Sequence, residues 1–439
     1  ERFMWVSPPD LTEKIVAHYN KTFDLPGVSS GARASVIGKI RSNKQYTVHN
    51  NGEKIIDVPA EEVTKGFLYD RPYENPNHQF IEPDLSETAD CNTILKKMLS
   101  HENIASRSVV YESYDKQVQG RTITEAGNSD SGVMAPFNSD DYPEEIRKVG
   151  IALSTDHNPR HSIISPYLGG VNAVVEAMRN VASVGATPHA VSDCLCFGNP
   201  EKPHQMWEFV EAVRGVSDAC NGITLKDNQE HSTPIIAGNV SFYNESKSGA
   251  IPPSPIVSCL GRINNIEKTI TMSLKNADNV VLMIGARKNE LGGSLFYDLH
   301  GELGANVPTP DLNEAKNQVY AITDCIDQIL LSSCHDISDG GIATTLSEMT
   351  FENNIGLCVT IPGDLAIEKL LFTETGGFVI EIDEKSLSQV ESVLQGYDLD
   401  CYNIGTTTKE PKISINDSID ISVEEAKHLW DNGLRNKIK

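Results

Sequence analysis

The sequence has little of what a membrane, secreted or nucleic-acid-binding protein needs. No apolar run in its 439 residues approaches the roughly 18 residues of a membrane span. Residues 1–5 are typical of a strand rather than a secretory signal, and the nine cysteines lack the spacing of a disulfide framework. Only 37 basic residues oppose 61 acidic ones, and the resulting net charge of −24 would repel a phosphate backbone. We therefore expect a cytoplasmic protein that binds neither membranes nor nucleic acids.

One order of predicted elements occurs twice in the chain. In residues 3–63 an apolar strand, a helical stretch and two further strands precede a helix that begins with Glu-Glu, and residues 378–426 show the same order. Chance similarity between two α+β segments is the alternative. A domain of its own, from about residue 263, precedes the second copy but not the first. We therefore expect the chain to begin inside a domain.

The same patterns divide the chain into four parts. We expect residues 1–65 to be the tail of an α/β domain and residues 66–90, rich in Pro, Asn and Asp, to be a linker. Residues 91–262 are predicted to form one domain and residues 263–439 another. A helix is predicted near residues 202–220. Its expected core face consists of Met206, Phe209, Val210, Val213 and Val216.

Two stretches combine an apolar strand with groups that suit a nucleotide. The predicted strand 188–194 ends near Asp193 and a Gly-Asn-Pro turn follows, a place where α/β proteins often hold ligands. After the apolar strand that follows, Gly238 lets a ligand approach the backbone. Asn239 offers an amide oxygen to a hard cation, and Ser241 offers a hydroxyl to a phosphate. Plain connections between elements are the alternative for both stretches.

Paired glycines at element boundaries suggest phosphate cradles. Residues 169–170 open a predicted helix, residues 292–294 follow a predicted strand, and Asp339 precedes the pair 340–341 at a helix start. Backbone N–H groups at such places attract anions, although we favour plain helix capping for residues 169–170, and ordinary turns explain the other two pairs at least as well. The candidates for an auxiliary phosphate site are Gly292, Gly293, Ser294 and Asp339.

The signals for a bound metal or a nucleophile are weaker. Cys194 and Cys196 share one face of a strand, but no second cysteine pair completes a four-ligand zinc site, so we do not favour zinc. For His157 and His161 we favour solvated or hydrogen-bonded side chains over metal ligands. The two cysteines also lack a recognisable histidine and carboxylate partner, so we expect no glutaminase activity and an outside source of ammonia.

Several motifs, taken in their order, resemble the large subunit of phosphoribosylformylglycinamidine synthase. The resemblance covers nearly the whole chain and rests on residues 114–120, 166–170, 193–203, 238–245, 290–294 and 335–341. That family duplicates an aminoimidazole ribonucleotide synthetase-like unit with a barrel-forming A domain and an α/β B domain. The resemblance implies the tail of the first B domain in residues 1–65, the second A domain in 91–262 and the second B domain in 263–439.

The resemblance also implies a carbon–nitrogen ligase of purine biosynthesis that uses ATP and magnesium. Such an enzyme phosphorylates formylglycinamide ribonucleotide to an iminophosphate, and ammonia then displaces the phosphate. A glutaminase subunit and a small bridging subunit are the implied partners. By position, Asp193 and Gly238 correspond to ATP contacts. Asn239 corresponds to a magnesium ligand and Ser241 to a ribonucleotide contact.

The chain departs from the family pattern in three respects. Cys196 stands where Asn is usual, and residues 128–131 stand where Gly-Asp-Ala-Ala is commoner. The family's catalytic histidines, its ATP lysine and most of its magnesium carboxylates lie upstream of Glu1, so we expect the chain to need the missing N-terminal half and to be inactive alone. A noncatalytic half that holds a structural nucleotide and docks the partner subunits is one alternative. A sister synthetase of the same fold is another, disfavoured because the sisters lack the motif that begins at Asp193.

Overall fold

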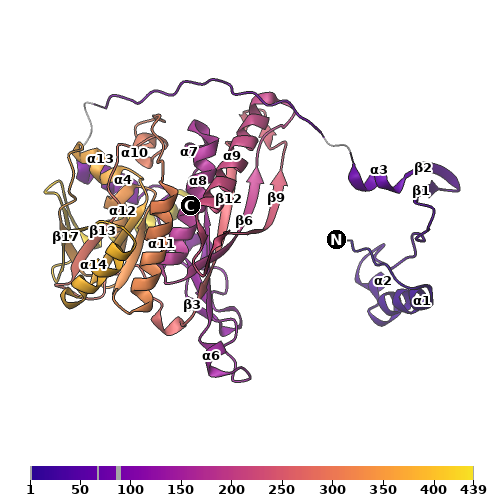
Figure 1. Ribbon diagram of the computed structural model, residues 1–439, viewed down its shortest axis with the longest axis horizontal. Helices are drawn as coiled ribbons and strands as arrows, with labels where there is room; N and C mark the ends of the chain where they lie inside the picture. The colour runs from indigo at the N-terminus through magenta and orange to yellow at the C-terminus, as the bar shows by residue number, and fades with distance from the viewer. Residues whose placement is uncertain (1, 67–68, 86–89, 439) are drawn as a thin grey trace. The chain divides into compact units, whose positions relative to one another are not determined.

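The computed structural model describes residues 2–66, 69–85 and 90–438 (Figure 1). The chain divides into two compact units, Glu1–Asp70 and Arg71–Lys439. No helix among the described residues is long and apolar enough to cross a membrane.

The first unit has short elements and no buried side chain among its described residues. Its helical segments are α1 (Pro9–Ala17), η1 (His18–Thr22), α2 (Leu25–Val28) and α3 (Ala60–Lys65). The strands β1 (Gln45–Asn50) and β2 (Glu53–Pro59) form an antiparallel hairpin that leads directly into α3. Apolar residues such as Trp5 and Ile37 are 66% and 79% exposed, so this unit has no core of its own.

The strands predicted near residues 3–6 and 36–40 do not form. Both segments are irregular in the structure. A strand needs a hydrogen-bonded neighbour, and no described segment of this unit pairs with either one. Apolar alternation therefore predicted two strands that have no pairing partner among the described residues.

The second unit begins with a six-stranded sheet in the order β3–β4–β5–β12–β6–β9, in which only β6 and β9 pair in parallel. Its strands are β3 (Thr122–Thr124), β4 (Gly132–Met134), β5 (Gly150–Asp156), β6 (Thr187–Cys196), β9 (Ile235–Ser241) and β12 (Ser254–Ile263). The helical segments of this region are α4 (Cys91–Leu99), α5 (Ser108–Tyr111), η2 (Val118–Gly120), α6 (Glu144–Arg147), α7 (Pro159–Ile164), α8 (Pro166–Ser183) and α9 (Pro203–Gly222). Two small hairpins pair β7 (Thr224–Leu225) with β8 (Asn228–Ser232) and β10 (Glu245–Ser246) with β11 (Gly249–Ala250). Figure 1 shows α8 and α9 beside β6 and β12.

The predicted helix near residues 202–220 is confirmed as α9, but its buried face is not the one expected. Val216 is buried, whereas the other expected core residues are half-buried or exposed: Met206, Phe209, Val210 and Val213. Small residues make the contact with α8 instead, because a Cβ on Gly170 would overlap the Ala212 carbonyl and one on Gly215 would overlap the Tyr167 carbonyl. Close helix packing thus accounts for a glycine at position 170 without a bound phosphate.

The second sheet has seven strands in the order β14–β16–β13–β17–β15–β18–β19. They are β13 (Val280–Ile284), β14 (Ser333–Ile337), β15 (Gly356–Val359), β16 (Gly377–Ile382), β17 (Cys401–Thr408), β18 (Lys412–Ile415) and β19 (Ile419–Ser422). The helical segments of this region are η3 (Ile266–Lys268), α10 (Leu295–Asp298), α11 (Leu312–Asp327), α12 (Gly341–Met349), α13 (Ile367–Phe372), η4 (Glu384–Ser386), α14 (Leu387–Gly396) and α15 (Val423–Ile438).

The inner strand β13 is buried on both faces. Leu282 and Ile284 belong to a core that includes α8, α11 and α14, whereas Val281 and Met283 belong to a core that includes α4 and α12. Because the first core also contains side chains of β5 and β12, the two sheets of this unit share one apolar interior. That shared interior packs α8 against β14 through side chains such as Val174 and Cys334.

Candidate functional site

The parallel pair β6 and β9 brings together the residues expected to bind a nucleotide. Asp193 lies opposite Gly238, Cys194 opposite Asn239, and Cys196 opposite Ser241. The two stretches thus lie side by side on adjacent strands. The three β9 residues lie within the strand rather than in a loop after it, because pairing with β6 continues as far as Ser241. Their roles in binding stay predictions.

These side chains lie on two faces of the sheet, since alternate residues of a strand point in opposite directions. An added Cβ on Gly238 would lie 2.5 Å from Asp193 Oδ1, so the carboxylate rests over the glycine. Burial raises the pKa of Asp193, and the backbone N–H of Asn239, which donates to it, acts the other way. On the opposite face Asn239 Nδ2 donates to Cys194 Sγ over 3.5 Å. The strand β9 is an edge of its sheet and is largely exposed, so a ligand has access to it.

Asn244, which sequence reasoning did not single out, orients Ser241. The Ser241 hydroxyl lies 3.2 Å from Asn244 Oδ1, and Asn244 Nδ2 donates to the Phe197 carbonyl over 3.0 Å. Tyr243 adopts a left-handed backbone with φ of 60° and donates its N–H to the Gly198 carbonyl. The turn after β9 is therefore attached to the turn after β6, which limits the motion of the Ser241 side chain.

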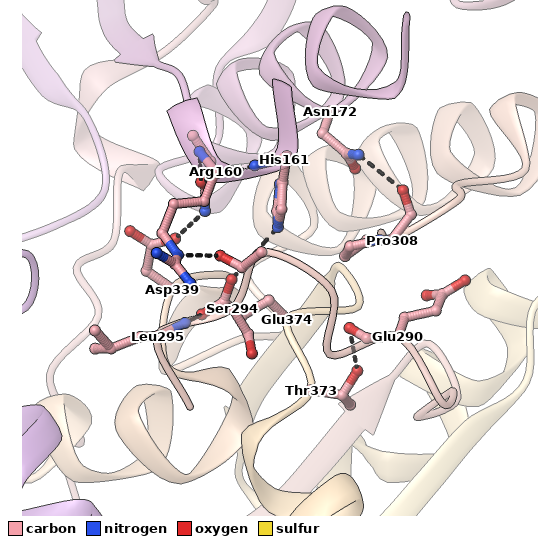
Figure 2. Close-up of polar contacts among 12 residues, drawn as sticks. Arg160, His161, Asn172, Glu290, Ser294, Leu295, Pro308, Asp339, Thr373 and Glu374 are labelled. Atoms are coloured by element: carbon pink, nitrogen blue, oxygen red, sulfur yellow. Dashed lines mark hydrogen bonds and ion pairs between the residues drawn. The ribbon is translucent and has the colours of Figure 1, made fainter. Parts of the chain in front are cut away.

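The expected auxiliary phosphate cradle at residues 292–294 donates its three backbone N–H groups to protein carbonyls, and a protein carboxylate lies next to it (Figure 2). Glu374 Oε1 accepts the backbone N–H groups of Leu295 and Gly340 over 2.8 and 2.9 Å. The Ser294 hydroxyl caps α10 by accepting the Tyr297 N–H. A Cβ on Gly293 would overlap His161, so the loop packs tightly on α7. A phosphate at this loop stays a prediction, and it would have to replace the carbonyl partners of these three N–H groups.

Next to this loop lies a buried histidine that pairs with the same carboxylate. His161 Nε2 is 3.5 Å from Glu374 Oε2, and the two side chains are 5% and 2% exposed. Neither ring nitrogen of His161 or of His157 has a hydrogen-bond partner. Burial, with His161 nearby, lowers the pKa of His157 to about 4. Asn158 Nδ2 donates to Asp339 Oδ1 over 3.1 Å, which links this region to the turn after β14.

Five carboxylates form what we call the acidic cluster: Asp130, Asp156, Glu176, Asp336 and Asp339. Burial and neighbouring carboxylates raise the pKa of Asp156 and of Glu176 well above the usual values. The same causes raise the pKa of Asp336 to about 6 and that of Asp339 to about 7. Arg179 is the nearby cation, with Nε 3.7 Å from Asp336 Oδ2. Asp336 is buried and the other four carboxylates are half-buried, and five acids exceed the cations beside them, which suits a further positive charge.

Asp130 and Asp336 could hold a metal ion, whereas His335 could not. Potential ligand atoms of these three residues lie within 4.8 Å of one another. His335 Nδ1, however, is 2.7 Å from Asp130 Oδ1, and its Nε2 is 3.0 Å from Glu348 Oε2. Burial opposes a charged imidazole, but these carboxylates raise the pKa of His335 well above its usual value. Because a doubly protonated ring has no free lone pair, oxygen atoms are the available ligands, and oxygen suits Mg²⁺.

Three polar atoms at the acidic cluster have no hydrogen-bond partner within the described part of the protein. Asp336 Oδ2, Asn180 Oδ1 and Arg179 Nε are buried without a hydrogen-bond partner. Buried polar groups are rarely left in that condition. Sequence reasoning named only Asp339 of this cluster as a site residue, because the other members are far apart in the chain and carry no local motif.

The sequence models of two related domain families match this second unit. "AIR synthase related protein, N-terminal domain" matches residues 130–263, and "AIR synthase related protein, C-terminal domain" matches residues 276–418. The chain therefore belongs to the AIR synthase related family, and the expected fold class is confirmed.

Within that family the relatives are subunits named phosphoribosylformylglycinamidine synthase subunit PurL, which confirms the resemblance found in the motifs. The chain is 42% identical to the subunit of Methanothrix thermoacetophila, over 100% of this chain and 57% of that relative. It is 33% identical to the subunit of Methanocaldococcus jannaschii, over 98% of this chain and 57% of that relative. The chain thus spans a little over half the length of these relatives.

Solved structures agree on the fold. Thermotoga maritima PurL complexed with FGAR has a TM-score of 0.61 at 17% identity, and the match covers 78% of this chain and 54% of that one. The same protein complexed with ATP has a TM-score of 0.56 at 18% identity, and the match covers 76% of this chain and 54% of that one.

Proposed function

We propose that the chain is part of an ATP-dependent ligase that converts formylglycinamide ribonucleotide to formylglycinamidine ribonucleotide with ammonia as nitrogen donor. The observation that carries this proposal is the 42% identity to a PurL subunit along the whole chain. Complexes of the Thermotoga maritima relative with FGAR and with ATP support the substrate classes. The reaction phosphorylates the amide oxygen and then replaces the phosphate by ammonia.

In this proposal β6 and β9 supply binding groups rather than an acid or a base. Asp193, whose carboxylate rests over Gly238, and the backbone of Gly238 contact the nucleotide on one face of the sheet. On the other face Asn239 uses its amide nitrogen for Cys194, which leaves its oxygen as the ligand atom for magnesium. The Ser241 hydroxyl, oriented by Asn244, contacts the ribonucleotide. Magnesium, when bound, neutralises phosphate charge, and the four residues fix the positions of the reactants.

The acidic cluster supports a second binding role. We propose that Asp130 and Asp336 bind a divalent cation that carries an auxiliary phosphate group, with Asp339 and Arg179 beside it. Unpartnered buried atoms favour this role, and a cation would offset the mutual repulsion of the carboxylates. An auxiliary nucleotide at this place is compatible with the noncatalytic alternative, in which the chain mainly holds the partner subunits together.

The domain boundaries and the partners remain proposals. The hairpin and helix β18–β19–α15 repeat the order of β1–β2–α3, which supports residues 1–65 as the tail of a B-type domain. The exposed apolar side chains of that segment agree with a domain that is completed elsewhere. We keep 66–90 as a linker, 91–262 as an A-type domain and 263–439 as a B-type domain. A glutaminase subunit, a small bridging subunit and a cytoplasmic location follow from the same proposal.

The test is product formation by the complete synthase that contains this chain. With the ribonucleotide, ATP, magnesium and ammonia present, we expect formylglycinamidine ribonucleotide and ADP in equal amounts, measured by mass spectrometry and a coupled ADP assay. ADP release without the amidated ribonucleotide would contradict the proposal.

A further inference from the structure

Two cysteines on β6 form a thiol pair beside the proposed binding residues. Cys194 Sγ and Cys196 Sγ lie 3.7 Å apart, and both side chains are half-buried rather than enclosed. No other two sulfur atoms of the described cysteines lie within hydrogen-bond distance; Cys91, Cys220, Cys259, Cys325 and Cys334 are buried, Cys401 is half-buried and Cys358 is exposed. The pair at 194 and 196 therefore differs from the other seven in having two thiols within reach of one ligand.

The spacing of the two sulfur atoms suits one tetrahedral metal ion. Two thiolates bound at about 2.3 Å, with an angle of about 109° between them, lie about 3.8 Å apart. The observed 3.7 Å is within 0.1 Å of that value, so both thiols can bind without moving the strand. Each thiol releases one proton to solvent as its metal–sulfur bond forms, and no electron is transferred.

A disulfide between the same two residues fits less well. Residues two apart on a strand have Cα atoms about 6.6–6.8 Å apart, at the upper end of the roughly 4.4–6.8 Å that disulfides span. The two sulfur atoms would also have to approach from 3.7 Å to about 2.05 Å, against the pairing of β6 with β9 and β12. Chelation needs neither change.

We propose that Cys194 and Cys196 chelate one thiophilic divalent cation, such as Zn²⁺ or Cd²⁺, on the open face of the sheet. This site differs from the four-ligand structural zinc site that the sequence lacks, because two positions on the ion stay open to water or to a phosphate oxygen. Asn239 contacts Cys194 directly, and Ser241 is the register partner of Cys196. A cation held here competes with magnesium and the ribonucleotide. This competition, unlike the binding of the cation, rests on the proposed function.

The first experiment measures binding by the 439-residue chain itself, fully reduced and free of metal. Titration with Cd²⁺ is followed by the ultraviolet thiolate-to-metal band, and Zn²⁺ is then added as competitor. We expect one tight ion per chain, and a loss of affinity of about 100-fold or more in Cys194→Ser and in Cys196→Ser. Cys401→Ser, which removes a single half-buried thiol, should bind as the wild type does. Unchanged binding in both variants of the pair would overturn the proposal.

A second variant guards against misfolding. Cys196→Asn keeps a polar side chain of similar size, and circular dichroism verifies its fold. It should lose the thiolate band to the same extent as Cys196→Ser. Retention of the full band in folded Cys196→Asn would place the ion elsewhere and overturn the assignment.

The competition is tested separately in the complete synthase, with each variant compared with its own rate in the absence of Cd²⁺. Low Cd²⁺ under excess magnesium should inhibit the wild type and the Cys401→Ser control, and it should inhibit Cys196→Ser about 100-fold less strongly. Cd²⁺ bound at the pair without inhibition would overturn the competition alone. If the synthase never amidates the ribonucleotide, the proposed function is wrong. The Cd²⁺ binding measured on the chain does not depend on that result.

Discussion

Replacing Asp336 by Asn should stabilise the protein at pH 8 when no divalent cation is present. The side chain is 2% exposed, and burial with the Asp130 charge raises its pKa from 3.8 to about 6. The folded state therefore holds a proton between about pH 4 and 6 that the unfolded state has released, so the free energy of unfolding falls as the pH rises through that window. The pKa difference of about 2 corresponds to about 3 kcal/mol, because each pKa unit is worth about 1.4 kcal/mol.

Asn cannot ionise, so Asp336→Asn should raise the free energy of unfolding at pH 8 by up to about 3 kcal/mol and have little effect near pH 4. The Ser338 hydroxyl can still donate to the amide oxygen as it does to the carboxylate. With magnesium present the wild type should become the more stable of the two proteins. The ion binds to and stabilises the wild type, whereas Asp336→Asn lacks one of its ligands. Urea unfolding at the two pH values, with and without magnesium, measures both effects. The exposed Asp364→Asn serves as control. Equal stability of variant and wild type at pH 8, or equal stabilisation of both by magnesium, would refute the reasoning.

Three further substitutions test the β6–β9 pair in the complete synthase by steady-state kinetics with ammonia. Asp193→Ala should raise the KM for ATP by about tenfold or more, because a hydrogen bond to a charged group is worth about 1.5–3 kcal/mol; an unchanged KM would make Asp193 structural. Gly238→Ala should have the same effect, since the new Cβ would lie 2.5 Å from Asp193 Oδ1 and displace the carboxylate. Ser241→Ala should raise the KM for the ribonucleotide but not that for ATP, whereas the exposed Ser248→Ala should change neither.

Local sequence predicted the parts of the site that lie on single strands. The stretches around Asp193 and Gly238 carry apolar strands and short polar motifs, which are visible in the sequence without knowledge of the fold. The acidic cluster was not predictable in this way. Asp130 and Asp336 are 206 residues apart, and only the packing of the two sheets brings them together. Glu374 at the 292–294 loop is a similar case, because its backbone partners come from two distant turns.

Helix packing and strand pairing explain where the predictions were wrong. Apolar periodicity selected Val213 for the core of α9, but the close approach of α8 is made by small residues such as Gly215 and Ala212. An apolar stretch such as 36–40 has strand character, yet a strand forms only where a neighbour offers hydrogen bonds. Apolar periodicity predicts which structures a segment is able to form. The neighbouring segment determines which of its residues are buried and whether a strand forms.

The magnesium dependence of Asn239→Leu in the complete synthase tests the central claim most directly. With ammonia as donor and ATP saturating, formation of formylglycinamidine ribonucleotide is measured across a range of magnesium concentrations. The wild type should amidate the ribonucleotide with one ADP released per product, and Asn239→Leu should need at least about tenfold more magnesium for half its own maximal rate, because one oxygen ligand is lost. A magnesium curve for folded Asn239→Leu that superimposes on the wild-type curve would contradict the assignment of this chain's strands to the ATP-dependent site.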